Sequence, residues 1–483
     1  MTDTETQPTL PAWEDRPTAA QDGEGRRWAA LRGQLPHLAL AVGFMAVYTV
    51  LALARYRRYA DPSWDLGIFV QTARGWASGH IPVVDIKGEG FRALGDHWSP
   101  ILALTGPLWR LWPSAVMLLV LQAALFAGSV GVLSKTAEEI LGRTRGLLIG
   151  VAYGLSWGLQ RALNFEFHEI AFAVPLLVVV GRQLLLRRWT RAFWWSLPLL
   201  LVKEDLGLTV AVVGVLLLVN RRWRLGPALV VIGVAWTAAA IWWWIPHFNP
   251  AGHFDYWSKL PGHNGRPQDW RVLARSLVTR HLVWTTLGWI AGATAFVALR
   301  SPIAALALPT LAWRFTSDNN AYWGRDWHYD ATVMAIVFIA LIDGLRRADD
   351  SPRAWLRTWS RNAVTAVVAV AAAATAAAPL PLADLVDPAT YDGGPHAAAL
   401  RQGLGIIPSG VTVEGGGAVL AHIACRTRAF WPGMIRSGPP QYIVTEDGRP
   451  SQEVADQASA GHPGHLYQVV FTRDTVTVVR LDH

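Results

Sequence analysis

Long apolar segments alternate with short polar ones between residues 36 and 380. A helix needs about 20 apolar residues to cross the hydrocarbon core of a bilayer, so this pattern predicts membrane-spanning helices. We expect about eleven of them, at 36–54, 115–133, 146–163, 170–186, 192–202, 206–220, 225–245, 281–299, 302–315, 331–345 and 363–380. Residues 1–35 are polar, and we expect them to form a disordered cytoplasmic tail.

One predicted span, 192–202, is short and ends at the charged run Lys203-Glu204-Asp205. Arginine pairs at 187–188 and 221–222 flank this region, and an even number of crossings separates them if both pairs are cytoplasmic. A single helix over 192–220 would be roughly 43 Å long and would place three charged groups in mid-membrane. The sequence therefore predicts two short helices that meet at Lys203.

Composition is typical of a multi-pass protein of the plasma membrane. Apolar residues make up 52% of the chain, and 26 residues are tryptophan. The net charge of +8 does not indicate a nucleic-acid partner, because the arginines form short clusters between apolar segments, as cytoplasmic loops do. The single cysteine, Cys425, excludes an intramolecular disulfide and a cysteine-based metal site.

With the N-terminus in the cytoplasm, residues 55–114 form the first loop on the outer face. This loop contains a helix candidate over 66–77 and a proline-interrupted apolar segment at 100–113, which is typical of an interfacial or re-entrant helix. The ionisable residues of this and later loops gather on the same face. Those that we single out are Asp65, Asp96, His97, Glu166, His168, Lys203, Glu204, Asp205, Arg325 and His328. Ionisable side chains at a membrane surface are candidates for function.

Residues 381–483 are more polar, and eleven crossings place them outside as well. Strand-like runs occur at 441–444, 466–471 and 476–481, and the last two are expected to pair as a hairpin. The predicted fold is thus an all-α polytopic membrane domain over 36–380, followed by a small extracytoplasmic α/β domain.

Five motifs resemble those of a family of predicted bacterial and archaeal polytopic membrane proteins, a domain of unknown function. They are Trp64–Phe69 with Gln71, His97–Pro100, Leu121–Ala123, Asn164–His168 and Val202–Asp205. That family in turn resembles the GT-C integral-membrane glycosyltransferases, which take a sugar from a polyprenyl-phosphate sugar on the outer face. The resemblance implies a polyprenyl-phosphate sugar as donor and a cell-envelope glycan, lipid or protein as acceptor.

Asp65 is the predicted catalytic residue, because it matches the position of an aspartate at the start of the first outer loop of GT-C enzymes. Attack of a hydroxyl on an anomeric carbon needs a carboxylate to take the proton. The alternative is that Asp65 caps the N-terminus of the following helix. Many GT-C members have a second acid beside this aspartate, whereas this chain has Trp64, so a metal ion is an option and not a requirement.

Further residues are expected to bind the substrate. The resemblance assigns lipid phosphate to Lys203, and the planar guanidinium of Arg325 suits a bidentate contact with phosphate. The substrate-binding set is Gln71, Asp96, His97, Glu166, His168, Glu204, Asp205 and His328. A divalent ion, if one is bound, would be held by members of the set Asp65, His97, Glu166 and His168. Each position also has a structural alternative: a loop anchor for Asp96-His97, a hydrogen-bonded pair for Glu166 and His168, and salt bridges within the Lys203–Asp205 run and between Arg325 and Asp326.

The function predicted from these observations is a membrane glycosyltransferase. Two alternatives remain open. A transporter or flippase of lipid-linked sugars usually has internal repeats and polar groups in mid-membrane. A non-catalytic cell-envelope assembly protein would tolerate loss of the loop acids. The sequence has no nucleotide-binding motif that would support ATP-driven transport.

Overall fold

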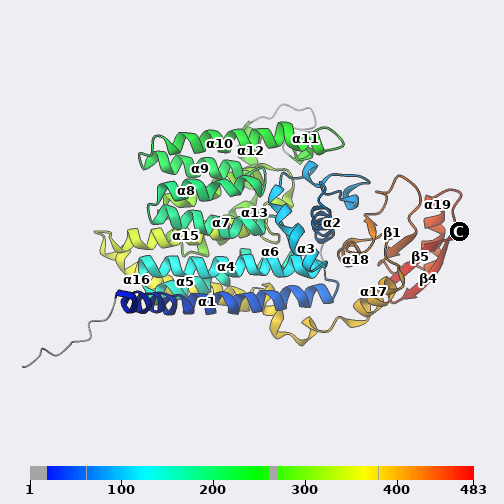
Figure 1. The fold of residues 1–483 in the computed structure, drawn as a ribbon, viewed down its shortest axis with the longest axis horizontal. Coiled ribbons are helices and arrows are strands. Elements are labelled where there is room, and N and C mark those ends of the chain that lie inside the picture. Colours follow the sequence, from blue (N-terminus) through cyan, green and yellow to red (C-terminus); the bar gives the residue numbers. More distant parts are fainter. Residues whose placement is uncertain (1–18, 61–62, 260–269, 379, 483) are drawn as a thin grey trace, which may run out of the picture.

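Helices run side by side through most of the chain, and a small sheet lies beyond one end of them (Figure 1). This computed structural model describes residues 19–60, 63–259, 270–378 and 380–482. Four helices are long and apolar enough to cross a membrane: Arg32–Arg57, Ala115–Leu141, Leu225–Phe248 and Ala354–Ala377. The predicted count of eleven spans is not confirmed by this number and stays a prediction.

The first helix, α1 (Ala19–Arg57), begins earlier than predicted. Residues 19–35, which we assigned to a disordered tail, are helical here because they are rich in strong helix formers such as alanine, arginine and leucine. Residues 1–18, the rest of the predicted tail, lie outside the described residues.

Shorter helices fill the remainder of the bundle. They are α5 (Arg143–Gly154), α6 (Trp157–Asn164), α7 (Ile170–Leu185), α9 (Leu206–Val219), α12 (Trp270–Thr279) and α13 (His281–Gly292). The longer neighbours are α4 (Ala115–Leu141), α10 (Leu225–Ala239, extended by η5 Ala240–Trp244 and α11 Ile245–Phe248), α15 (Asp330–Asp349) and α16 (Ala354–Ala377). Two predicted spans are divided, because α5 ends at Gly154 before α6 and α13 ends at Gly292 before η7 (Val297–Arg300).

The chain breaks at Lys203, as predicted. Helix α8 (Trp189–Ser196) continues as the 3₁₀ helix η4 (Leu197–Leu201), and α9 starts only at Leu206. The other short span is built in a similar way, with η8 (Pro302–Ala307) followed by α14 (Leu308–Thr316). A 3₁₀ turn rises about 2.0 Å per residue against 1.5 Å in an α-helix, so these short segments extend further than their lengths suggest.

Helix α15 is the centre of the bundle, and every residue from 330 to 345 is buried. Helices α9 and α10 pack so closely that glycine is needed at their contacts. A Cβ atom added to Gly207 would lie 2.6 Å from the Gly233 carbonyl oxygen, and one added to Gly214 would lie 2.7 Å from that of Gly226. Such small-residue contacts are typical of helices packed in membranes.

The C-terminal domain is a five-stranded mixed sheet with the order β2-β1-β3-β5-β4. Strands β1 (Thr412–Glu414), β2 (Arg428–Phe430) and β3 (Tyr442–Thr445) are parallel, whereas β4 (Tyr467–Arg473) and β5 (Val476–Leu481) form the predicted antiparallel hairpin. Helices α17 (Gly394–Ile406), α18 (Gly417–Ile423) and α19 (Ser451–Gly461) complete the domain. Strands β1 and β2 were not predicted, because three residues are too few for an alternating pattern.

The C-terminal domain contacts the first loop through helix α2 (Asp65–Ala77) and the 3₁₀ helix η1 (Asp85–Lys87). Gln71 joins the two parts: its amide nitrogen donates to the Ala429 carbonyl at 2.8 Å, and its amide oxygen accepts from the Ile86 N–H at 3.2 Å. Arg428 adds a two-contact ion pair to Asp85, at 2.8 and 3.1 Å. The rest of the loop is helical near 100–113 as well, with η2 (Ala93–Gly95), η3 (Pro100–Leu104) and α3 (Thr105–Leu111).

Candidate functional site

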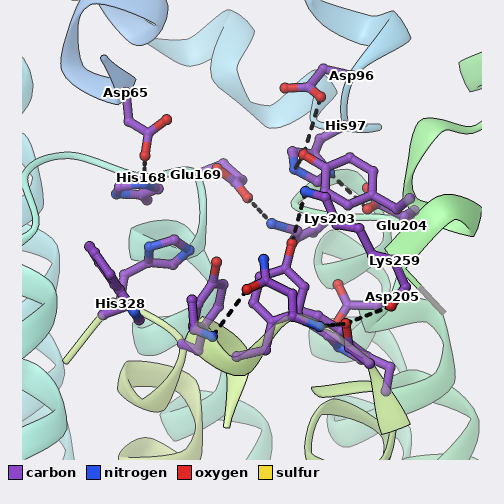
Figure 2. Close-up of a pocket in the computed structure, with 18 of the residues that line it drawn as sticks. Asp65, Asp96, His97, His168, Glu169, Lys203, Glu204, Asp205, Lys259 and His328 are labelled. Atoms are coloured by element: carbon purple, nitrogen blue, oxygen red, sulfur yellow. Dashed lines mark hydrogen bonds and ion pairs between the residues drawn. The ribbon is translucent and has the colours of Figure 1, made fainter. Parts of the chain in front are cut away.

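A cavity of about 490 Å³ opens among the loops at the end of the bundle that faces the C-terminal domain. Its walls combine residues that are far apart in sequence, and four of the five motifs contribute to them. The lining comes from segments 64–69, 87–97, 165–169, 203–208, 237–241, 254–259 and 313–329. Figure 2 shows the charged groups converging on this space.

Asp65 lies on one wall, at the first turn of α2. The His168 Nε2 atom is 3.3 Å from the Asp65 Oδ2 atom, so the imidazole can donate to this carboxylate (Figure 2). The Asp65 side chain is 26% exposed, whereas that of His168 is 5% exposed. Asp65 is therefore the member of the pair that a ligand in the cavity can reach.

Asp65 does not cap its own helix. The carboxylate of Glu166 does so instead, because its Oε2 atom accepts from the Leu66 N–H at 2.9 Å. Gln122 of α4 then fixes the segment that carries Glu166 and His168: it donates to the Glu166 carbonyl at 2.6 Å and accepts from the His168 N–H at 3.1 Å. Three of the five motifs thus form one connected unit.

The other two motifs meet on the opposite wall. Glu204 accepts from the His97 Nδ1 atom at 2.8 Å and from the Trp98 N–H at 3.1 Å. Tyr256 contacts His97 Nε2 at 2.8 Å and Asp96 at 3.2 Å, and Lys87 forms an ion pair with Asp96. A doubly protonated His97 satisfies this network, since it then donates to Glu204 and Tyr256 while the tyrosine hydroxyl donates to Asp96.

The charges on this wall shift one another's pKa values. Burial and the charge of Lys203 work to lower the His97 pKa. The carboxylates of Glu204 and Asp96 outweigh these two effects and raise the His97 pKa above its usual value of 6.5. Burial works to raise the pKa of Glu204, yet His97 and Lys203 lower it. Burial works to raise the pKa of Asp96 as well. The positive charges of Lys87 and His97 lower it by more, so the Asp96 pKa is well below its usual range.

Lys203 lies between the two walls and pairs with Glu169, a residue that the sequence analysis did not identify. The Lys203 ammonium is 2.7 Å from Glu169, and both side chains are buried. Burial works to raise the Glu169 pKa, but Lys203, with smaller effects of two histidines, lowers it to about 2. The structural alternative, a salt bridge within the Lys203–Asp205 run, is not what the structure shows, because Lys203 pairs with another segment. A buried lysine needs a counter-ion, and this need was the available signal.

His328 and Asp205 complete the lining that the sequence predicted. The rings of His328 and His168 stack with centroids 3.7 Å apart, and burial, then His168, lowers the His328 pKa well below 6.5. Asp205 accepts from the Trp313 indole at 2.9 Å, and burial with the Glu204 charge raises the Asp205 pKa despite Lys203. The Nδ1 atoms of both histidines and Oδ1 of Asp205 are buried with no hydrogen-bond partner among the described residues.

Three predicted site residues lie outside the cavity lining, and one of them, Glu166, is the residue that caps α2. Gln71 joins α2 to the C-terminal domain, as described above. Arg325 stacks on Trp289, with its guanidinium carbon 4.2 Å from the ring centroid, and the expected partner Asp326 instead lies 3.9 Å from Arg161. Arg325 is thus not part of the lining, and its assignment to lipid phosphate stays a prediction.

Lys259, which the sequence analysis also missed, does line the cavity. Its ammonium donates to the Tyr322 hydroxyl at 3.1 Å and lies over the Tyr256 ring at 4.1 Å. In contrast to Lys87 and Lys203, it has no carboxylate of the described residues within 4 Å. Part of the loop that contains it, residues 260–269, lies outside the described residues.

The four residues considered for a divalent ion are not brought together. Asp65 and His168 are neighbours, but Glu166 is directed to the Leu66 N–H and His97 to Glu204. In the part of the chain that the structure describes, no three side chains of histidine, cysteine, aspartate or glutamate are close enough to share a metal ion. The donor set therefore does not form a site of the zinc type, in which three or four protein side chains converge on the ion.

A family model described as "Predicted membrane protein (DUF2079)" matches residues 59–400, which include all five motifs. The chain belongs to this family. No curated protein matches it.

Among solved structures, the chain is similar to ArnT from Cupriavidus metallidurans bound to undecaprenyl phosphate. The TM-score is 0.50 at 14% identity, over 90% of this chain and 98% of that one. The apo form of the same protein gives 0.48 at 13% identity, over 91% and 98%. The first likeness shows the fold alone, and it agrees with the GT-C-like membrane fold that the DUF2079 motifs implied.

Proposed function

We propose that this DUF2079 protein is a membrane glycosyltransferase that moves a sugar from a polyprenyl-phosphate donor to an extracytoplasmic acceptor. One observation carries the proposal: a single cavity holds a reachable carboxylate, Asp65, and a lysine without a carboxylate partner among the described residues, Lys259. The Asp65 carboxylate can act as a base, and the Lys259 ammonium can bind a phosphate. The ArnT structure contains undecaprenyl phosphate, which supports a lipid of this class as the partner.

In the proposed reaction, the acceptor oxygen attacks the anomeric carbon of the donor sugar. The bond from that carbon to the phosphate oxygen breaks, and the phosphate leaves with the bonding electrons. Asp65 takes the acceptor proton, and His168 holds the Asp65 carboxylate in place through its Nε2 atom. All atoms come from donor and acceptor, so no further co-reactant is needed.

Lys259 is the proposed contact of the lipid phosphate, in place of Arg325. Lys87 and Lys203 each face a carboxylate already, so their charges are largely compensated. The Lys259 ammonium can lie near the leaving phosphate and stabilise its developing negative charge. The positive charge of Lys203 adds to the electrostatic attraction for the phosphate, and the ion pair with Glu169 holds the Lys203 ammonium in place.

Several groups are proposed to bind the sugar. Asp205 and His328 offer buried polar atoms without a partner among the described residues, and such atoms gain hydrogen bonds when sugar hydroxyls approach. Asp96, His97 and Glu204 form the opposite wall. Glu166 and His168 act mainly on Asp65, as the contacts above indicate.

The orientation in the membrane is also a proposal, and tryptophans at both ends of the bundle support a membrane between them. The turn between α9 and α10 and the start of α16 lie at the end away from the C-terminal domain (Figure 1). The first contains the exposed Trp223 and the second the exposed Trp355. Trp242 and Trp243 are exposed at the other end of α10. Arg221 and Arg222 follow α9, and Arg346 and Arg347 lie in the last turn of α15, at the first end, so the positive-inside rule makes that end cytoplasmic.

The test uses purified protein in proteoliposomes with undecaprenyl-phosphate sugars that carry labelled arabinose, mannose or glucose, and a delipidated cell-envelope fraction as acceptor. We expect release of undecaprenyl phosphate with transfer of label, reduced at least about 100-fold by Asp65→Asn. Asp456→Asn, an exposed change on α19, is the matched control. Equal transfer by wild type and Asp65→Asn would remove Asp65 from the mechanism, and movement of intact donor across the bilayer without release would support a carrier instead.

A further inference from the structure

A second cavity, of about 580 Å³, lies within the C-terminal domain and shares no lining residue with the first. It opens where β1 and β3 end, since Glu414 closes β1 and Thr445 closes β3. In the sheet, β1 lies between β2 and β3, so the connection after β1 leads to one side of this strand and the next parallel strand, β3, lies on its other side. Ligands of open sheets with parallel strands bind at such a switch point, beyond the carboxyl ends of the strands.

The lining of this second cavity favours a ligand with many hydroxyl groups. Glu414, only 5% exposed, accepts from the Gly433 N–H at 3.2 Å, and the Thr445 hydroxyl is buried with no partner among the described residues. Glu446 and Asp447 add carboxylates, and the arginine of the lining, Arg449, is paired with Asp447 at 2.7 Å. This excess of acceptors disfavours phosphate and other anions.

An apolar patch completes the lining. It consists of the apolar residues Pro432, Ile443, Val454 and Ala458. A pyranose or furanose ring has the matching character, with an edge of hydroxyl donors and a face of C–H groups. The space of about 580 Å³ is within the range of small-molecule sites.

The second cavity is adjacent to the transfer site through two contacts. Trp64, which lines the first cavity, packs edge-on against Trp431 at 5.0 Å, and the next residue, Pro432, lines the second. A Cβ atom added to Gly417 would lie 2.7 Å from the Ser63 carbonyl oxygen, so the glycine turn after β1 touches the chain just before Asp65. The Trp64–Trp431 ring pair thus connects the wall of the first cavity to the chain segment that lines the second.

We propose that the second cavity binds an uncharged sugar residue. We further propose that this sugar is part of the acceptor glycan, and this second step rests on the proposed function. The acceptor would extend from the C-terminal domain, past Trp431 and Trp64, to present its hydroxyl to Asp65.

The test measures saturation-transfer NMR signals of free sugars on the full chain in nanodiscs, with glucose, galactose, mannose, arabinose, N-acetylglucosamine and glucosamine as probes. We expect a signal for at least one neutral sugar, reduced at least about 5-fold by Glu414→Gln and by Gly416→Val. Gly416 has an extended backbone, and an added Cβ would lie 3.3 Å from Glu446 Oε1, so valine fills the cavity without removing a charge. Asp456→Asn should leave the signal unchanged, and thermal unfolding checks that each variant folds.

The inference fails if the wild-type chain gives no signal with any neutral sugar, if glucosamine alone binds, or if folded Glu414→Gln and Gly416→Val both bind as well as wild type. The Asp65→Asn variant separates this result from the proposed function, because it should abolish transfer and leave the sugar signal intact. If the wild-type protein transfers sugar but binds no free sugar, the proposed glycosyltransferase function is supported and the proposed sugar site in the second cavity is wrong.

Discussion

The carboxylate of Glu166 accepts a hydrogen bond from the Leu66 N–H at 2.9 Å, so a residue 100 positions away caps the helix that carries Asp65. Glu166 reaches this position from a left-handed backbone conformation, with φ of 69°. Such a conformation is costly for a non-glycine residue and persists where the surroundings fix it. Gln122 supplies that restraint through its contacts on either side of Phe167. Glu166 is therefore a positioning residue for the proposed base.

We expect Glu166→Ala to reduce kcat for sugar transfer about tenfold with little change in the donor KM, because the start of α2 would shift while the donor contacts remain. Loss of a helix cap also costs about 1 kcal/mol of stability. Glu166→Gln keeps an oxygen that can accept from Leu66 and should recover most of the rate. Steady-state kinetics of the two variants check this, and equal losses in both would assign a direct role to the charge of Glu166.

Local patterns allowed the sequence to predict much of the fold. The helix that begins near Asp65, the break at Lys203 and the hairpin of β4 and β5 all follow from short-range periodicity or charge. The sequence predicted that the motifs lie on the same face of the membrane, because their loops share one side of the topology. It did not predict which side chains are in contact there.

The partners within the site were not predictable for the same reason. Glu169 follows His168 directly but contacts Lys203. Lys259 belongs to a loop rich in aromatic residues, and such residues are also common wherever a chain meets the membrane interface. Arg325 shows that a charge alone does not specify a ligand. Its charge suggested phosphate, yet a guanidinium also stacks well on an indole ring, and Trp289 provides one. Pattern alone does not decide between these two uses.

Lys259→Met should raise the donor KM at least tenfold and lower kcat, because the lysine without a carboxylate partner would no longer meet the phosphate. Stability should change little, since the lysine forms a hydrogen bond and ring contacts instead of a buried ion pair. Lys259→Arg keeps the charge and should retain most of the affinity. The check is a titration with undecaprenyl phosphate as a competing ligand. Unchanged inhibition in Lys259→Met would place the phosphate elsewhere.

Lys203 and Glu169 should behave as a coupled pair. Lys203→Met leaves Glu169 buried without its counter-ion, at a cost of about 3–5 kcal/mol, whereas the double variant Lys203→Met/Glu169→Gln should recover most of that loss. Thermal unfolding in detergent measures the cycle. Additive losses in the double variant would show that the two side chains do not depend on each other.

The His97–Glu204 pair gives the protein a defined dependence of stability on pH. The His97 pKa is raised above 6.5, so its contribution to stability is fully present below pH 6.5 and is lost as the pH rises through the raised value. The Glu204 pKa is lowered below 4.5, so its contribution is present above pH 4.5 and is lost as the pH falls through the lowered value. Both contributions are complete between about pH 4.5 and 6.5.

We expect the unfolding temperature to be higher at pH 6 than at pH 9, and we expect His97→Gln to reduce that difference because glutamine does not titrate. The comparison of both proteins at the two pH values decides the matter: an equal difference in wild type and His97→Gln would mean that other groups cause the pH dependence.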